Sequence, residues 1–219
     1  MQDTISFLND LQVNNNREWF HGNKARYDAN KQNFETLVTE ILKGVMSFEQ
    51  WGPTEPKSCI FRINRDVRFS TNKSPYKNYF SAAFGDGGRH SEKVDFYLHL
   101  QPDNIFMGGG MWAPTPPQLQ AYRQEIDYNA IALRNILNEK TFKAFYHKIE
   151  GESLKKAPKG YSIEHPDLDL LARKQLFVMH QFSNKEALHP DFAQKVIDGC
   201  KIMRPFKQFF NQLFFENND

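Results

Sequence analysis

The chain has 219 residues, and its 28 lysines and arginines against 26 aspartates and glutamates leave a formal net charge of only +2. A chain of this length can bury a sizeable core. The near balance of charge excludes a strongly basic nucleic-acid coat protein, so any cationic function has to be local. No stretch approaches about 18 uninterrupted apolar residues, which excludes a membrane-spanning helix.

The cysteines and the N-terminal residues indicate the compartment. Cys59 and Cys200 are the two cysteines, and they form neither a CxxC motif nor a disulfide framework. The first residues, MQDTISFLNDL, lack the basic and apolar regions of a secretory signal. We therefore expect a reduced, cytoplasmic protein. The 20 phenylalanines predict a core built on aromatic packing.

The first 50 residues have the apolar spacing of helices. A short amphipathic stretch, ISFLNDL, is followed by NNN, whose asparagines are expected to cap the next helix at REWF. From Lys24 to Phe48 apolar residues recur mostly at helical spacing, and WGPTEPKS then ends the pattern.

Residues from about 58 to 112 are predicted to form an antiparallel meander. In KVDFYLHLQ, apolar and polar residues alternate with a period of two, which is typical of a strand with one buried and one polar face. PDN is the expected turn into the returning strand IFMGGGMW, and NYFSAAFG supplies an alternating segment upstream. Residues 61–69 would be the first strand of this meander.

Helical patterns return after the meander. TPPQLQAYRQEI has Thr115 followed three residues later by Gln, a capping-box pattern, and SNKE is a second one. QLFVMHQF predicts a strand near 175–182, and the last helix should span about 190–215 with a kink at Pro205. These elements predict one α+β domain over residues 1–219, in which a central antiparallel sheet packs with N-terminal and C-terminal helices.

The stretch FRINRDVRFSTNKSPYKNYF concentrates positive charge. Arginine suits bidentate recognition of phosphate or carboxylate, and lysine adds a point charge. We therefore expect an anion-binding surface, the alternative being surface ion pairs that cover a sheet edge. The stretch contains one acid, Asp66, and five cations: Arg62, Arg65, Arg68, Lys73 and Lys77.

Arg65 stands out within the predicted strand, because there it would fall on the apolar face. A buried arginine without a partner is costly. Either the strand bends at this point, or Arg65 reaches a carboxylate such as Asp95.

A glycine run, Gly108, Gly109 and Gly110, lies at a strand end shortly before a helix N-terminus. Consecutive glycines let backbone amides approach an anion, and the helix end adds favourable partial charge. A glycine bulge that lets Trp112 or another aromatic residue pack explains the run equally well.

His99 is the candidate general base or acid if the protein is an enzyme, because it shares a strand face with Tyr97 and Asp95. An ordinary polar sheet face is the alternative. The chain has no GxSxG, HxH or HExxH motif, and EHPDLDL fits a helix entry with acids in its first turn. No metal and no cofactor is predicted.

The leading interpretation is therefore a site for a small phosphorylated or other anionic ligand. One alternative is nucleic-acid binding, with Tyr76, Tyr79 and Phe80 as stacking faces, which the near-zero net charge disfavours. The other is docking of an acidic protein partner. Enzymatic activity and oligomeric state stay open. The expected ligand-binding residues are Arg62, Arg65, Arg68, Lys73, Tyr76, Lys77, Tyr97, Gly108, Gly109 and Gly110.

Longer segments carry a family resemblance. They are FRINRDVRFSTNKSPYKNYF, FYLHLQPDNIFMGGGMW and PKGYSIEHPDLDLLARK, with FLNDLQVNNNREWF and MRPFKQFFNQL toward the two ends. Together they resemble the uncharacterised microbial family described as domain of unknown function number 2461. The resemblance covers nearly the whole chain and implies an intracellular single-domain protein, with no established reaction, substrate or cofactor. It places the recurring motif of the family on Arg62, Arg65, Asp66, Arg68, Lys73, Pro75, Tyr76, Lys77, His99, Gly108, Gly109, Gly110 and Trp112.

Overall fold

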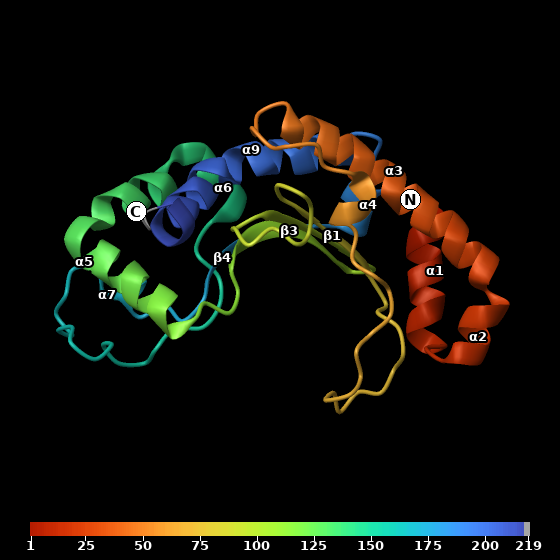
Figure 1. Ribbon diagram of the computed structural model, residues 1–219, viewed down its shortest axis with the longest axis horizontal. Coiled ribbons are helices and arrows are strands. Elements are labelled where there is room, and N and C mark those ends of the chain that lie inside the picture. The colour runs from red at the N-terminus through yellow and green to blue at the C-terminus, as the bar shows by residue number, and fades with distance from the viewer. Residues whose placement is uncertain (217–219) are drawn as a thin grey trace. The chain divides into compact units, whose positions relative to one another are not determined.

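The computed structural model describes residues 1–216, which group into two compact units (Figure 1). Unit 1 comprises residues 1–91, 96–107 and 181–198. Unit 2 comprises residues 92–95, 108–180 and the described residues from 199 onward. The single domain expected over the whole chain stays a prediction.

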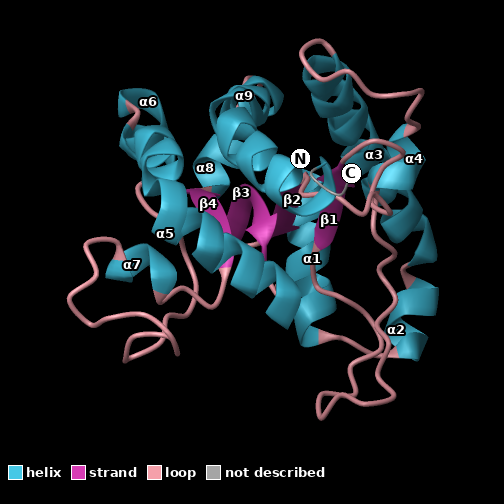
Figure 2. Cartoon of the chain, turned by 60° about the vertical axis from the view of Figure 1, so that its left-hand side comes forward, coloured by secondary structure: helices cyan, strands magenta, loops and turns pink. Residues whose placement is uncertain are grey.

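Four strands form one antiparallel sheet in the order β1-β2-β3-β4, coloured magenta in Figure 2. The pairing of the first two strands runs from Phe80 opposite Leu100 to Phe84 opposite Phe96. The predicted α+β class is confirmed, as are the later strands of the meander and the strand near 175–182. The strands are β1 (Phe80–Phe84), β2 (Phe96–Gln101), β3 (Asn104–Met111) and β4 (Leu176–Phe182).

Helices make up most of the rest. Unit 1 contains α1 (Gln2–Val13), α2 (Arg17–Gly22), α3 (Lys24–Met46), α4 (Pro56–Cys59) and α8 (Asn184–Ala187). Unit 2 contains α5 (Pro116–Asn138), α6 (Lys140–Tyr146), α7 (Leu168–Leu171) and the π-helix η1 (Gln212–Glu216), while the residues of α9 (Phe192–Asn211) divide between the units. No helix within residues 1–216 has both the length and the apolar character needed to cross a membrane.

Local sequence signals determine several helix starts. The Asn16 side chain caps α2 by accepting a hydrogen bond from a backbone N–H of the first turn. Thr115 at α5 and Ser183 at α8 head complete capping boxes, as predicted. Pro205 lies inside α9.

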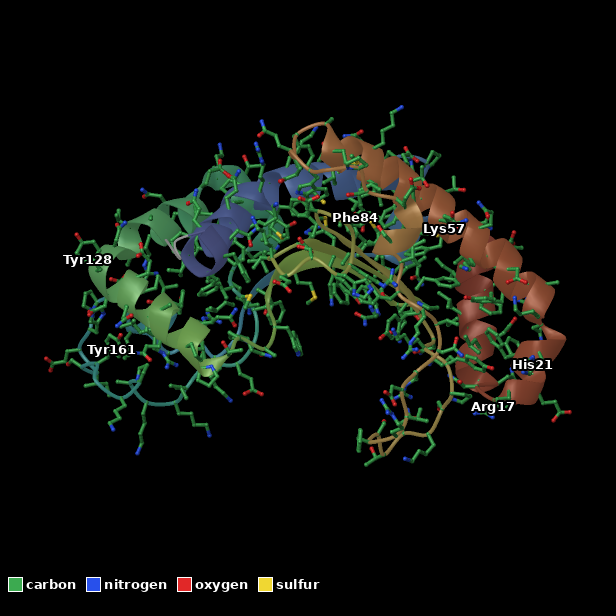
Figure 3. The ribbon with its side chains drawn as sticks, in the orientation of Figure 1. Arg17, His21, Lys57, Phe84, Tyr128 and Tyr161 are labelled. Atoms are coloured by element: carbon green, nitrogen blue, oxygen red, sulfur yellow. The ribbon has the colours of Figure 1, made fainter. Side chains whose placement is uncertain are left out.

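The core of unit 1 is aromatic, as the phenylalanine content predicts. Phe34 of α3 stacks on Phe80 of β1 with ring centroids 5.3 Å apart. Phe84 and Phe96 are fully buried, and Figure 3 labels Phe84 among the side chains beside the sheet. The period of two in β2 is confirmed on its apolar side, because Leu98 and Leu100 are buried together with Phe96.

Unit 2 has an aromatic core of its own. Phe206 contacts Phe142 and Phe210, with ring centroids 5.8 Å and 4.8 Å away. By contrast, Tyr128 of α5 is 91% exposed (Figure 3).

The segment 61–69 is not a strand, and the prediction that it forms the first strand of the meander is wrong. Residues 61–79 form an extended loop between α4 and β1, which we call the cationic loop (Figure 1). Its two limbs meet at a single bridge between Asn64 and Tyr76. Pro75 cannot donate a hydrogen bond to a ladder, and Phe69, which would share the apolar face of such a strand with Arg65, is 97% exposed.

Candidate anion-binding site

The cationic loop is held to the helices at the start of the chain by Asn15. The Asn15 amide donates to the Tyr76 carbonyl at 3.0 Å and accepts from the Tyr76 backbone N–H at 3.1 Å. The Tyr76 ring stacks on Phe20 with centroids 3.9 Å apart, and the tyrosine is 6% exposed. These contacts position the next residue, Lys77.

The limbs of the loop also bond to each other through their backbones. The Arg65 N–H donates to the Pro75 carbonyl at 2.9 Å, and the Lys77 N–H donates to the Ile63 carbonyl at 2.8 Å. Arg65 therefore lies in a loop, not on a buried sheet face. The sequence left two alternatives for Arg65, a bend in the chain or an ion pair with a carboxylate such as Asp95. The structure shows that the chain departs from a regular strand at this residue.

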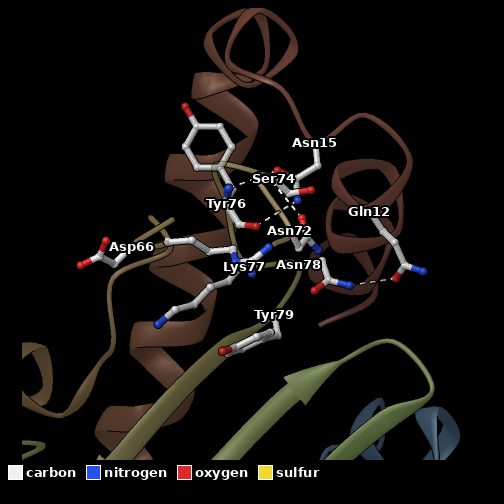
Figure 4. A pocket seen from close by; sticks show the side chains of 10 residues that line it. Gln12, Asn15, Asp66, Asn72, Ser74, Tyr76, Lys77, Asn78 and Tyr79 are labelled. Atoms are coloured by element: carbon white, nitrogen blue, oxygen red, sulfur yellow. Dashed lines mark hydrogen bonds between the residues drawn. The ribbon is translucent and has the colours of Figure 1, made fainter. Parts of the chain in front are cut away.

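A cavity of about 540 Å³ lies within unit 1 beside the cationic loop (Figure 4). Its walls combine charged, amide and hydroxyl groups with two tyrosines. The lining residues are Gln12, Asn15, Arg65, Asp66, Asn72, Ser74, Tyr76, Lys77, Asn78 and Tyr79.

Two of the five cations in the loop, Arg68 and Lys73, already have hydrogen-bond partners within the loop. The Arg68 guanidinium bonds the Asp66 carboxylate, with Nη2 to Oδ2 at 2.7 Å and Nε to Oδ1 at 3.0 Å. This pairing lowers the pKa of Asp66. Lys73 donates from Nζ to the Val67 carbonyl at 3.0 Å. Both contacts stabilise the loop itself: the charges of Arg68 and Asp66 balance each other, and Lys73 donates a hydrogen bond to a neutral carbonyl.

Arg65 and Lys77 are the two of the five cations that line the larger cavity, and neither has an ion-pair partner in the described part of the chain. Both side chains are partly buried. Arg65 makes one side-chain hydrogen bond there, from Nη2 to the Ser70 hydroxyl at 3.3 Å. Burial, together with the nearby charge of Arg62, lowers the pKa of Lys77.

Arg62 does not line this cavity. It is exposed and borders a smaller one of about 240 Å³, together with Lys31 and Lys57. Lys57 there is 3.8 Å from a carboxylate oxygen of Glu35. The structure therefore distributes the predicted cations among two cavities and two internal pairs.

His99 is not on an exposed polar face. It is 7% exposed, and its ring lies between Tyr79, with centroids 4.2 Å apart, and Phe106, 4.7 Å apart. Nδ1 is 3.2 Å from the Tyr97 hydroxyl, and Nε2 is 3.1 Å from the Gln101 side-chain oxygen.

This enclosure favours the neutral imidazole. Burial lowers the pKa of His99, the hydrogen bond to Gln101 opposes that shift, and the charge of Lys77 reinforces it. Burial also raises the pKa of Tyr97, against a hydrogen bond from Ser81. Neither His99 nor Tyr97 lines the larger cavity; His99 instead contacts the ring of Tyr79, which does line it.

The glycine run belongs to unit 2, whereas the cationic loop belongs to unit 1. A Cβ at Gly108 would lie 2.2 Å from the Val178 carbonyl oxygen, and one at Gly110 would lie 2.2 Å from the Leu176 carbonyl oxygen. Close backbone approach within unit 2 therefore accounts for these glycines. Their expected contact with an anion stays a prediction.

Two of the three acids of EHPDLDL, Asp167 and Asp169, have a structural partner. Arg134 bonds Asp167 at 2.9 Å and Asp169 at 3.0 Å, and the His165 ring is 3.0 Å from Asp127. Within residues 1–216, no three His, Cys, Asp or Glu side chains come together as metal ligands would.

The sequence patterns did not identify the amide groups of the cavity. In NNN, expected as a helix cap, Asn16 alone caps α2, while Asn14 bonds the Asp10 carbonyl and Asn15 holds the loop. The sequence did contain a signal for this second role of NNN, because three consecutive asparagines are more than one helix cap requires. Of the expected ligand-binding residues, Arg65, Tyr76 and Lys77 line the larger cavity.

Comparison with family models gives a match to the family described as conserved hypothetical protein (DUF2461), over residues 3–209. The chain belongs to this family. The resemblance stated from the sequence motifs is thereby confirmed. Comparison with curated proteins and with solved structures gave no match. Membership of DUF2461 brings no activity with it, so function has to be argued from the cavity.

Proposed function

We propose that this DUF2461 chain binds a small anionic ligand in the cavity beside the cationic loop, with Arg65 and Lys77 supplying the positive charge. One observation carries the proposal: two partly buried cations face a polar cavity without a carboxylate partner in residues 1–216. Partial removal of a cation from water is costly, and a bound anion offsets that cost.

The chemistry of the two side chains fits this role. The guanidinium of Arg65 can bind two oxygens of a phosphate, sulfate or carboxylate, and the ammonium of Lys77 adds a compact charge. A volume of about 540 Å³ lies within the range of small-molecule sites. Burial lowers the pKa of Lys77, and an anion bound beside it would raise that pKa again, so the anion and the charged lysine favour each other.

The alternatives have no such support. Of the three aromatic residues expected to stack on nucleic-acid bases, Tyr76 and Phe80 are buried inside unit 1, and only Tyr79 remains partly accessible in the cavity. An acidic protein partner would meet the exposed cations Arg62, Arg68 and Lys73, and Arg68 is already paired with Asp66.

The test is isothermal titration calorimetry of the purified protein with inorganic sulfate and phosphate at low ionic strength. We expect Arg65→Gln and Lys77→Met each to weaken binding about tenfold or more, since hydrogen bonds to charged groups contribute roughly 1.5–3 kcal/mol. Lys73→Met is the matched control for lysine and Arg62→Gln the one for arginine, because both residues belong to the cationic loop and neither lines the larger cavity. Both variants should stay within about threefold of the wild type.

The proposal is wrong if the wild type binds neither anion, or if all four variants weaken binding equally. Equal weakening would mean that only general surface charge matters. Binding of an oligonucleotide with a steep salt dependence, without binding of either inorganic anion, would favour the nucleic-acid alternative instead.

A further inference from the structure

The walls of the larger cavity carry uncharged polar groups that an inorganic anion does not need. Gln12, Asn72 and Asn78 contribute side-chain amides, and Ser74 contributes a hydroxyl. These groups line the same cavity as Lys77 (Figure 4) and as Arg65, so their hydrogen-bonding capacity indicates what accompanies the anionic group.

Each of these amides is only partly used. Asn78 donates from Nδ2 to the Gln12 side-chain oxygen at 3.1 Å, which leaves the Asn78 oxygen and the Gln12 amino group. The Asn72 oxygen accepts from the Ser74 N–H at 2.9 Å, which leaves the Asn72 amino group and the Ser74 hydroxyl. These remaining groups have no hydrogen-bond partner among residues 1–216.

The remaining set mixes donors with an acceptor. The amino groups of Gln12 and Asn72 can donate to any anion, but the Asn78 oxygen can only accept. A fully ionised sulfate has no proton to offer that oxygen, whereas an alcohol hydroxyl both donates and accepts. The mixture therefore matches a ligand that bears hydroxyl groups beside its anionic group.

Tyr79 supplies a further wall. The Lys77 ammonium lies 5.7 Å from the centroid of the Tyr79 ring and 5.5 Å from that of Phe61, and of these two rings Tyr79 lines the cavity, so an anion bound at Lys77 has the Tyr79 ring close by. The ring is backed by His99, with centroids 4.2 Å apart. Tyr76 cannot provide a second aromatic face, because its ring is stacked on Phe20. A nucleobase therefore has no aromatic pair to enter, while a small polyol needs none.

From this cavity we infer that the ligand is a phosphorylated polyol of the sugar-phosphate class, with the phosphate at Arg65 and Lys77 and the hydroxyl groups at the amides of Gln12, Asn72 and Asn78. The inference rests on the proposed function, because it takes the anion to bind at those two cations. The same site would recognise the carboxylate of a sugar acid by the same chemistry.

The test is titration calorimetry with a panel of probes: sulfate, glucose 6-phosphate, fructose 6-phosphate, glycerol 3-phosphate, glucuronate, glucose and adenosine 5′-monophosphate. We expect at least one of the polyol phosphates to bind tenfold or more tightly than sulfate. Glucose alone should not bind measurably, since it lacks the charge. Glucuronate separates a carboxylate source of the anion from a phosphate source.

Variants assign the added affinity to the amides. Asn78→Leu should weaken the polyol phosphate fivefold or more and leave sulfate binding unchanged, whereas Arg65→Gln should weaken both. Gln12→Leu, from α1, provides a second variant if Asn78→Leu does not fold, and circular dichroism checks the fold of each.

The outcomes separate the two proposals. If sulfate binds through Arg65 and no polyol phosphate binds more tightly, this inference is overturned and the anion site stands. The same holds if adenosine 5′-monophosphate is the tightest probe, or if Asn78→Leu weakens sulfate and polyol phosphate alike. If no probe binds at all, both proposals fail.

Discussion

Replacing Asn15 by Ala should open the cationic loop, because one side chain satisfies both backbone groups of Tyr76. The Asn15 amide donates at 3.0 Å and accepts at 3.1 Å, across 61 positions of sequence. A net hydrogen bond contributes about 1 kcal/mol, so loss of both should cost roughly 2 kcal/mol. Asn15→Asp keeps the acceptor and loses the donor, which predicts about half of that cost.

The assay is amide hydrogen exchange, because it reports local opening rather than unfolding of either unit. The amides of Arg65 and Lys77 bond within the loop, to the Pro75 and Ile63 carbonyls, and are the reporters. A loss of roughly 2 kcal/mol predicts about 30-fold faster exchange at both amides in Asn15→Ala.

The control is Asn78→Ala, which removes an exposed bond to the Gln12 side chain and should change loop exchange by less than about threefold. Unchanged exchange of the Arg65 and Lys77 amides in Asn15→Ala would refute the claim that this asparagine holds the loop. Equal acceleration in Asn78→Ala would show that any change at the cavity wall opens the loop.

Three further predictions concern unit 1. Gly88→Ala should lower the free energy of unfolding, measured in urea, by more than about 2 kcal/mol, because φ is +92° and the new Cβ would lie 2.7 Å from Ser58 backbone atoms. Gly87→Ala is the control: its φ is +76° but no atom lies within 4 Å of the new Cβ, so it should cost only about 1 kcal/mol. The lowered pKa of His99 means that the unfolded chain binds more protons, so stability should fall as the pH drops below 6.5, less steeply in His99→Asn. As the pH is raised, sulfate affinity should begin to decline before the usual lysine pKa of 10.5 is reached, because Lys77 loses its proton earlier than an ordinary lysine. Lys77→Arg should remove that decline.

The sequence patterns correctly predicted the features that depend on neighbouring residues alone. The period of two in β2 and the capping boxes at Thr115 and Ser183 depend on residues within one or two turns of each other, and the structure confirms them. The same period applied to residues 61–69 was wrong, because alternation alone does not supply a paired neighbour. The bonds that fix the loop come from Asn15, far away in the sequence.

The basic residues show most clearly what the sequence alone does not predict. In the sequence, Arg65 and Arg68 are equivalent members of one basic stretch with one acid. In the structure, Asp66 pairs with Arg68, and Arg65 is left without an acidic partner in the described chain. The choice depends on how the backbone turns within the loop, which the alternation of apolar residues does not encode. Burial of His99 likewise depends on Tyr79 and Phe106 from neighbouring segments.

The two kinds of cation imply that ligand binding and loop order are linked. Arg68 and Lys73 fasten the loop to itself, and Asn15 fastens it to the helices, while Arg65 and Lys77 contribute unbalanced charge. An anion that binds only the closed loop stabilises it by about 2.7 kcal/mol at one hundred times its dissociation constant. That exceeds the roughly 2 kcal/mol expected from the Asn15 bonds. A saturating ligand should therefore restore slow amide exchange in Asn15→Ala, whereas an anion bound elsewhere would leave the loop open.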